Sequence, residues 1–361
     1  MTTTSTTFYH RSSAILSHLE ETGQLKHLQM IESPMGPRIS IRERGEVDCF
    51  CSNNYLGLAN HPDVVEAGIE GLRTYGAGTS SVRFICGTFA PHEALEERIA
   101  SFLGVEASYS FVSCWNATEA TFPTLCQDGD VIVSDELNHA CIIDSMRLTT
   151  AIHRGVSKCI YKHSDMESLR EALVTACEKR SDDGTIFVIT DGVFSMEGDI
   201  AKLPEIRELC DQFGGVLVVD DSHGTGVMGE TGRGTHEHYG MAGKDIDIFT
   251  GTLGKALGGG AGGYVAGKRE AVELLVQRGR PTLFSNALPV TVACSAKAAI
   301  DTLDKNPALV QKLRDNVAAV RKGIGEVGFE VLESPTAICP IIVGETATAI
   351  AMSNKLLDMG V

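Results

Sequence analysis

One lysine stands inside the most glycine-rich stretch of the chain. This stretch, TGTLGKALGGGAGGYVAG, covers residues 250–267 and contains Lys255. A phosphate-binding P-loop is excluded, because Phe249 stands where its first glycine should be and Ala256 follows the lysine. A dinucleotide-binding loop is disfavoured, because the glycines at 258–263 lead into a strand-like GYVAG and not into a helix. The remaining chemistry is that of a lysine amine that forms a Schiff base with a carbonyl compound.

Pyridoxal phosphate (PLP) is a carbonyl cofactor that a lysine holds in this way, and its other requirements can be sought in the sequence. Its ring nitrogen needs a carboxylate at the carboxyl end of a central strand. Asp220 follows the apolar run Val216–Val219, and His223 comes shortly after it, where it could hydrogen-bond the phenolic oxygen of the ring. Alone, the two would be interpreted as ordinary turn residues. Together with Lys255, they favour a PLP site.

The phosphate and the open face of the PLP ring need partners as well. N–H and hydroxyl groups at the start of a helix suit a phosphate, and the segment SCWNATEA offers Ser113, Cys114 and Trp115. Ser195 and Thr252 could add hydroxyl groups, and His139 in DELNHACIID could stack on the ring. Each of these residues could also be an ordinary cap or core residue, so their interpretation depends on Lys255 and Asp220.

The elements that must position these residues alternate between short apolar runs and helical patterns. The runs SYSFVS, DVIVSD, TIFVITD, GVLVVDD and DIDIFTGT are typical of strands buried on both faces. Helical stretches such as 165–180, capped by Ser164 or Asp165, lie between them. The alternation predicts an α/β fold whose large domain has a mostly parallel central sheet.

The pattern changes around RGRPTLFSNALP, where a long helical stretch begins at Val290 and leads to two strand candidates, FEVLES and ICPIIVG. We therefore predict an N-terminal segment over 1–55, a large PLP-binding domain over 56–289 and a smaller C-terminal α/β domain over 290–361. A last helix is predicted from about Thr346 to Gly360, with Val361 opening a further strand. The small domain is thus expected to be truncated, in a protein a few tens of residues longer.

Composition narrows the function classes. The 361 residues carry a formal net charge of −16, which disfavours a general attraction to nucleic acid or to an anionic membrane. The 11 cysteines are scattered without a C-x-x-C pair, so neither a disulfide framework nor a metal site is expected. No apolar run approaches the roughly 20 residues of a membrane span, and the first residues do not resemble a signal peptide. A cytoplasmic protein is predicted.

Seven motifs resemble, in matching order, those of the α-oxoamine synthases, PLP enzymes of fold type I. The motifs are NNYLGLANHPDV, SVRFICGT, ELNHACIID, TDGVFSMEGD, VDDSHGTGVMGETGRG, GTLGKALGG and RPTLFSNAL. RFICGT and LFSNAL are similar to the glycine C-acetyltransferase branch of that family. Two features depart from this branch: Trp115–Thr118 replace its usual Phe-Asp-Ala-Asn, and SHGTG resembles the 8-amino-7-oxononanoate synthases.

The resemblance implies a role for each matching residue. Lys255 is implied as the Schiff-base lysine, Asp220 as the partner of the ring nitrogen, His223 as the partner of the phenolic oxygen and His139 as the stacking ring. The implied phosphate and cofactor contacts are Cys114, Trp115, Ser195 and Thr252, with Ser285 and Asn286 reaching the PLP of the other subunit in a homodimer. Asn53, or Asn54 beside it, is implied to contact the substrate carboxylate, and a carboxylate-binding arginine is expected after residue 361.

The implied reaction is a reversible condensation of glycine with acetyl-CoA to 2-amino-3-oxobutyrate and CoA, which also serves threonine breakdown. Lys255 would act as general base, and His223 or His139 would polarise the thioester. One alternative is a sister synthase, such as 8-amino-7-oxononanoate synthase, that takes another amino acid or a longer acyl-CoA. Another is an inactive partner subunit of the same fold, against which Lys255 counts because such a subunit has no need of the amine.

Overall fold

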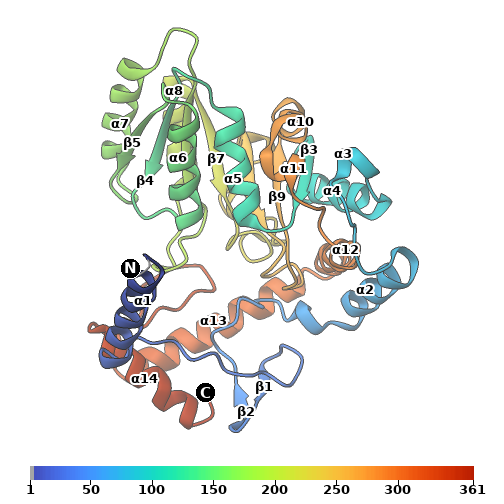
Figure 1. Cartoon of the computed structure of the whole chain (residues 1–361), viewed down its shortest axis with the longest axis vertical. Coiled ribbons are helices and arrows are strands. Elements are labelled where there is room, and N and C mark those ends of the chain that lie inside the picture. Colours follow the sequence, from blue (N-terminus) through green and yellow to red (C-terminus); the bar gives the residue numbers. More distant parts are fainter. Residues whose placement is uncertain (1–3) are drawn as a thin grey trace. The chain divides into compact units, whose positions relative to one another are not determined.

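The computed structural model describes residues 4–361, which form two compact units (Figure 1). The larger unit is Asn53–Pro340, and the smaller unit combines Met1–Ser52 with Ile341–Val361. Within the described range, no helix has the length and apolar character that crossing a bilayer requires. The domain boundaries that we predict at residues 55 and 289 stay predictions.

Seven strands form the central sheet of the larger unit, in the order β3-β9-β8-β7-β6-β4-β5. Their bounds are β3 Ala107–Phe111, β4 Val131–Asp135, β5 Ser157–Tyr161, β6 Ile186–Asp191, β7 Gly215–Asp220, β8 Ile248–Thr252 and β9 Gly263–Gly267. From β8 to β5 all neighbours are parallel, whereas β9 is antiparallel to both of its neighbours. The predicted α/β fold with a mostly parallel sheet is confirmed, and each of the five predicted apolar runs forms a strand.

Successive residues of the central strands face two separate hydrophobic cores. In β7, Leu217 and Val219 belong to one core and Val218 belongs to the other. The first core includes residues of α7 (Met166–Lys179) and α8 (Leu203–Phe213), and the second includes residues of α5 (Cys114–Leu125) and α6 (Ala140–Ile152). Helices therefore cover both faces of the sheet (Figure 1). This explains why the central strands are apolar throughout.

The other helices of the larger unit pack around this sheet or link its strands. They are η1 Leu58–Asn60, α2 Pro62–Tyr75, α3 Arg83–Cys86, α4 Ala90–Leu103, α9 Thr235–His238, η2 Gly243–Asp245, α10 Arg269–Arg278, α11 Arg280–Phe284, α12 Val290–Lys305 and α13 Ala308–Glu326. Of the two caps predicted for α7, Asp165 is the one that accepts backbone N–H bonds, from Glu167 and Ser168. A side-chain cap thus fixes where α7 starts after β5.

The two strands predicted at 329–334 and 338–344 are wrong, because these segments are irregular apart from single bridge residues at Val331 and Ile341. The side chain of Arg321 provides hydrogen bonds that a neighbouring strand would otherwise provide. The Arg321 guanidinium donates to the carbonyl oxygens of Leu332, Thr336 and Ile338. Carbonyl groups that are satisfied in this way do not need a strand partner, so the apolar pattern alone is misleading.

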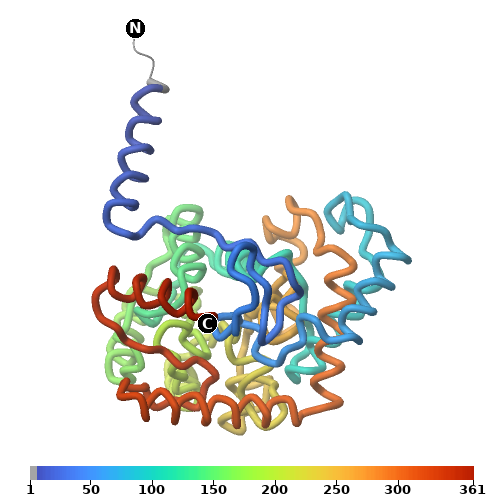
Figure 2. Tube along the Cα trace, turned by 90° about the horizontal axis from the view of Figure 1, so that it is seen from below, coloured from blue at the N-terminus to red at the C-terminus, as the bar shows by residue number. Residues whose placement is uncertain are grey.

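The smaller unit consists of helix α1 (Thr4–Glu21), a hairpin of β1 (Arg38–Ile41) and β2 (Gly45–Asp48), and helix α14 (Thr346–Asp358). The hairpin and the last helix are in contact. Asp48 of β2 donates its N–H to the carbonyl oxygen of Gly360 at 2.8 Å, and Leu357 of α14 packs on the small hydrophobic core of the hairpin. Figure 2 shows this red C-terminal helix beside the blue hairpin. The predicted last helix is confirmed, with Gly360 at a φ of +90° directly after it.

Candidate active site

A cleft at the carboxyl ends of β6, β7 and β8 brings together most of the predicted site residues. It is lined by Cys114, Trp115, His139, Cys141, Asp191, Ser195, Asp220, Ser222, His223, Thr252 and Lys255. The cleft has a volume of about 580 Å³, including space open to solvent. Its position agrees with the rule that parallel sheets bind ligands beyond the carboxyl ends of their strands.

A continuous chain of hydrogen bonds leads away from the lysine amine. Lys255 Nζ lies 2.7 Å from Nε2 of His223, and Nδ1 of that ring lies 2.8 Å from the hydroxyl of Tyr55. The Tyr55 hydroxyl in turn donates to Oδ1 of Asn53 at 3.3 Å. Because the tyrosine proton points to Asn53, His223 donates from Nδ1 and accepts from Lys255 at Nε2. The chain of contacts therefore fixes one neutral tautomer of His223.

The surroundings of His223 and Lys255 lower the pKa of both groups. Burial, followed by the nearby charge of Lys255, lowers the pKa of His223 to about 3. Burial also lowers the pKa of Lys255, against the opposing attraction of Asp220. The neutral lysine amine is the nucleophile that a carbonyl cofactor needs and the base that takes a proton.

Asp220 ends β7 with its carboxylate held in one orientation. Its Oδ1 accepts the backbone N–H of Ser222 at 3.1 Å, and its Oδ2 accepts the hydroxyl of Thr250 at 2.8 Å. The Cys114 thiol lies 3.6 Å from the same Oδ2. Burial, together with the charge of Asp220, raises the pKa of the Cys114 thiol well above its usual range, so this cysteine is a neutral donor and not a nucleophile.

Asp191 lines the cleft as well, although the sequence interpretation did not select it. It ends β6 and is paired in register with Asp220 on β7. Burial, together with the charge of Asp220, raises the pKa of Asp191 well above its usual range. Both carboxylates follow apolar strand runs, so their common position at the end of adjacent parallel strands was the signal that could have found Asp191. Cys141, Ser222 and the nearby Tyr55 were also missed.

The first turn of helix α5 faces the cleft with Cys114 and Trp115. Ser113 caps this helix by accepting the N–H of Asn116 at 3.1 Å, while the other N–H groups of the first turn have no acceptor within the helix. A Cβ at Gly263 on β9 would collide with the backbone of Cys114. Glycine at 263 therefore lets the helix start lie directly against the sheet, where it can hold an anion.

The glycine-rich stretch allows the chain to turn, and its glycines do not line the cleft. None of its glycines is among the residues that line the cleft as described. Instead the run turns the chain from Lys255 into β9, and Gly262 has a φ of +103°, which side-chain-bearing residues rarely adopt.

His139 and Thr252 combine a structural contact with a place in the cleft. His139 caps α6, since its Nδ1 accepts the N–H of Cys141 at 3.2 Å, and its ring lies edge-on to that of Trp115. Thr252 accepts the N–H of Gly254 at 3.0 Å through its hydroxyl oxygen. The capping and the cofactor-contact interpretations are thus compatible for both residues, and their cofactor contacts stay predictions.

The predicted residues outside the cleft lie in two places. Asn53 is joined to the cleft through Tyr55, whereas the side chain of Asn54 is occupied by the N–H of Ala59 at 3.1 Å. Asn53 is therefore the better candidate for substrate contact. Ser285 and Asn286 line a separate cleft together with Arg83 and other residues, and the structure does not bring them to Lys255.

Residues 48–361 match the family of class I and II aminotransferases. The chain belongs to this family. It is 46% identical to 8-amino-7-oxononanoate synthase of Thermoanaerobacter pseudethanolicus, over 96% of this chain and 85% of that protein. It is 40% identical to 2-amino-3-ketobutyrate coenzyme A ligase of Escherichia coli K12, over 98% of this chain and 87% of that protein. Both relatives are α-oxoamine synthases, and the chain is an enzyme of this type, as the motifs predict.

Solved structures agree. A serine palmitoyltransferase variant from S. paucimobilis with bound PLP–myriocin aldimine superposes with a TM-score of 0.88 at 27% identity, over 98% of this chain and 87% of that one. Sphingomonas wittichii serine palmitoyltransferase has a TM-score of 0.88 at 29% identity, over 97% of this chain and 86% of that one. Fold type and family together confirm the predicted cofactor, PLP.

The chemistry of the cleft fits PLP group by group. Lys255 offers an amine with a lowered pKa to the cofactor's carbonyl. Asp220 is a fixed carboxylate for the ring nitrogen, and the start of α5 offers N–H groups to the phosphate. His223, whose pKa is lowered to about 3, adds no charge to the cleft, and its hydrogen bond to the phenolic oxygen stays a prediction.

Tyr55 gives a first test of the site. We expect Tyr55→Phe to lower kcat roughly tenfold, because a buried donor left without its acceptor costs about 1–3 kcal/mol, and here Nδ1 of His223 would lose that acceptor. Steady-state kinetics beside Tyr75→Phe provide the comparison, since Tyr75 makes a ring contact with Phe89 away from the cleft. Equal kcat in both variants would show that Tyr55 does not orient His223.

Proposed function

We propose that the protein condenses glycine with acetyl-CoA, giving 2-amino-3-oxobutyrate and CoA, in a reversible reaction that also serves threonine breakdown. The observation that carries the proposal is the contact of the Lys255 amine with neutral His223, in one cleft with Asp220. The choice of substrates is supported by the motifs RFICGT and LFSNAL and by relatives named 2-amino-3-ketobutyrate coenzyme A ligase.

Each residue then has a defined task. When bound, PLP supplies an electron sink for the charge that develops at the amino-acid α-carbon. Lys255 Nζ takes the α-proton as general base, and Nε2 of His223 accepts a hydrogen bond from the ammonium group that results. Asp220 keeps its orientation through Ser222 and Thr250.

His139 is the better candidate for polarising the thioester oxygen. Both ring nitrogens of His223 are occupied, by Lys255 and by Tyr55. His139 accepts an N–H bond at Nδ1, so its ring proton is on Nε2, which can act as a donor. We therefore assign to His139 the hydrogen bond to the acyl oxygen, where negative charge develops during carbon–carbon bond formation.

A second candidate function is that of an 8-amino-7-oxononanoate synthase, with another amino acid and a longer acyl-CoA. Relatives of that name are 41–46% identical to the chain, and the SHGTG segment resembles theirs. Crossed assays with glycine, alanine and serine against acetyl-CoA and longer acyl-CoAs separate the two. The proposal requires the highest kcat/KM for glycine with acetyl-CoA, and a preference for alanine with a longer acyl-CoA would replace it.

We also propose a homodimer with shared sites, because Ser285 and Asn286 lie outside the cleft of their own Lys255. An inactive Lys255→Ala chain mixed with a Ser285→Ala/Asn286→Ala chain should regain roughly a quarter of wild-type activity, since half of randomly paired dimers have one intact site. Activity is measured after subunit exchange has been verified with labelled chains. Without recovery, these residues would act within their own subunit.

A further inference from the structure

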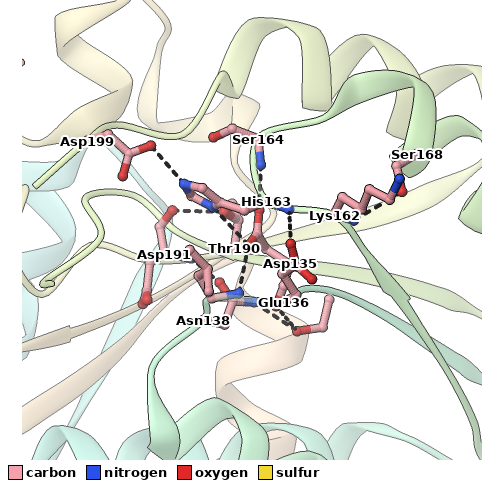
Figure 3. A network of polar contacts seen from close by, with 12 residues as sticks. Asp135, Glu136, Asn138, Lys162, His163, Ser164, Ser168, Thr190, Asp191 and Asp199 are labelled. Carbon is pink, nitrogen blue, oxygen red and sulfur yellow. Dashed lines mark hydrogen bonds and ion pairs between the residues drawn. The ribbon is translucent and has the colours of Figure 1, made fainter. Parts of the chain in front are cut away.

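His163 lies between two carboxylates that belong to different parts of the chain (Figure 3). Its Nδ1 is 3.0 Å from Oδ1 of Asp135, the last residue of β4, and its Nε2 is 2.9 Å from Oδ2 of Asp199. A carboxylate oxygen can only accept, and a neutral imidazole has a single N–H. Both contacts are hydrogen bonds only when His163 is an imidazolium.

The charges around His163 favour this protonated form. Burial works against it, but the hydrogen bonds and negative charges of Asp135 and Asp199 outweigh burial and raise the pKa of His163 above its usual 6.5. Glu136 adds a third carboxylate by accepting the backbone N–H of His163 at 3.0 Å. The cation next to it is Lys162, whose backbone N–H is bonded to Ser168.

Asp199 belongs to the segment Gly192–Ile200, which we name the Ser195 loop and which carries Ser195 into the cleft. The loop folds on itself through backbone bonds between Phe194 and Asp199 and between Phe194 and Gly198. The ring of Phe194 also lies edge-on to His163, with centroids 4.4 Å apart. Oδ1 of Asp199 is buried without a partner in the described chain, so the carboxylate depends on its bond to His163.

Asp135, the second carboxylate that contacts His163, is held in place by further hydrogen bonds. Asp135 is buried and also accepts the N–H groups of Leu137 and Ser164. Asn138, in the turn after β4, accepts the N–H of Asp191, which in turn accepts the N–H of His139. The end of β4 is thus tied, through Asn138 and Asp191 (Figure 3), to the turn that carries His139.

We propose that protonated His163 is a positioning residue: it clamps the Ser195 loop to the end of β4, and its deprotonation releases the loop. A group with a raised pKa stabilises the folded arrangement fully below its ordinary value and loses this effect as pH rises through the raised value. The Ser195 loop should therefore be held below about pH 6.5 and loosen as the pH rises through the raised pKa of His163. The proposal depends on the cofactor cleft and not on which amino acid or acyl-CoA is used.

Hydrogen exchange of the Ser195 loop, corrected for intrinsic rates and measured without substrate, tests the clamp. In the wild-type protein, protection should fall between about pH 6 and about pH 9, by roughly tenfold for each unit by which the pKa is raised. Nitrogen-15 NMR of histidine-labelled protein, with His163→Gln for assignment, should give a His163 pKa that matches the midpoint of this loss.

His163→Gln should expose the loop at about pH 6 to the level of the wild-type protein at about pH 9 and remove its pH dependence. Asp199→Asn, which keeps the side-chain size, should act in the same direction and decides the matter if His163→Gln does not fold. His153→Gln is the matched control, because Nε2 of His153 contacts the carbonyl of Pro123 outside this network. Equal wild-type protection at both pH values, or full protection without His163, would overturn the proposal.

Discussion

Replacing Lys255 with alanine is expected to abolish the Schiff-base absorption of the PLP-loaded protein and to lower condensation activity by about a thousandfold or more. General bases typically contribute about 10²–10⁴-fold, and Lys255 is in addition the covalent anchor of the cofactor. The alanine side chain has no amine to meet Nε2 of His223, which lies 2.7 Å from Nζ in the intact site. Binding through Asp220 and the start of α5 would remain.

Absorption spectra with added PLP and mass spectrometry after borohydride reduction measure this outcome. The wild-type protein should carry the cofactor mass on the peptide that contains Lys255. Lys268→Ala is the matched control, because Lys268 is an exposed lysine of the same region that pairs with Asp247 at 3.6 Å. A yellow Lys255→Ala protein with the cofactor mass on another lysine would reassign the anchor.

Much of the large unit could be predicted because its signals are local. A buried parallel strand needs apolar residues on both faces, and the run Gly215–Asp220 has them, with one core on either side. The edge strand Ser157–Tyr161 has no such signal, because Lys158 and Ile160 are exposed. Edge strands are half exposed, so their patterns are weaker.

The cleft could be predicted as far as its residues follow strand ends. Asp220 was found because a chemical requirement and a strand end coincide at its position, and Lys255 was found because it stands alone in the glycine-rich stretch 250–267. Tyr55 could not be found in this way, since its contact with His223 joins residues 168 positions apart in the chain. The same holds for His163, whose partners come from a different strand and a different loop. Contacts of this kind depend on tertiary packing and leave no periodic pattern.

Replacing Asp220 with asparagine is expected to lower turnover by roughly 10²–10³-fold, the loss typical of removing one preorganised electrostatic contact to the reacting group. The fold should remain intact. An asparagine at this position can still accept the N–H of Ser222 through Oδ1, and its amide can donate to the hydroxyl of Thr250. What disappears is the negative charge that keeps the cofactor's ring nitrogen protonated.

Asp191 is a second carboxylate beside Asp220, so the Asp220→Asn variant also tests which of the two supplies the charge. Asp191 is paired with Asp220 in register, and its raised pKa depends partly on that neighbour. Losing the charge of Asp220 should therefore lower the pKa of Asp191, whose Oδ2 accepts the N–H of His139. Turnover and cofactor spectra of Asp220→Asn are compared with Asp211→Asn, an exposed aspartate that pairs with Arg207. Near-normal turnover in Asp220→Asn would mean that the neighbouring Asp191 supplies the charge, and the double variant would then lose the activity that the single variant keeps.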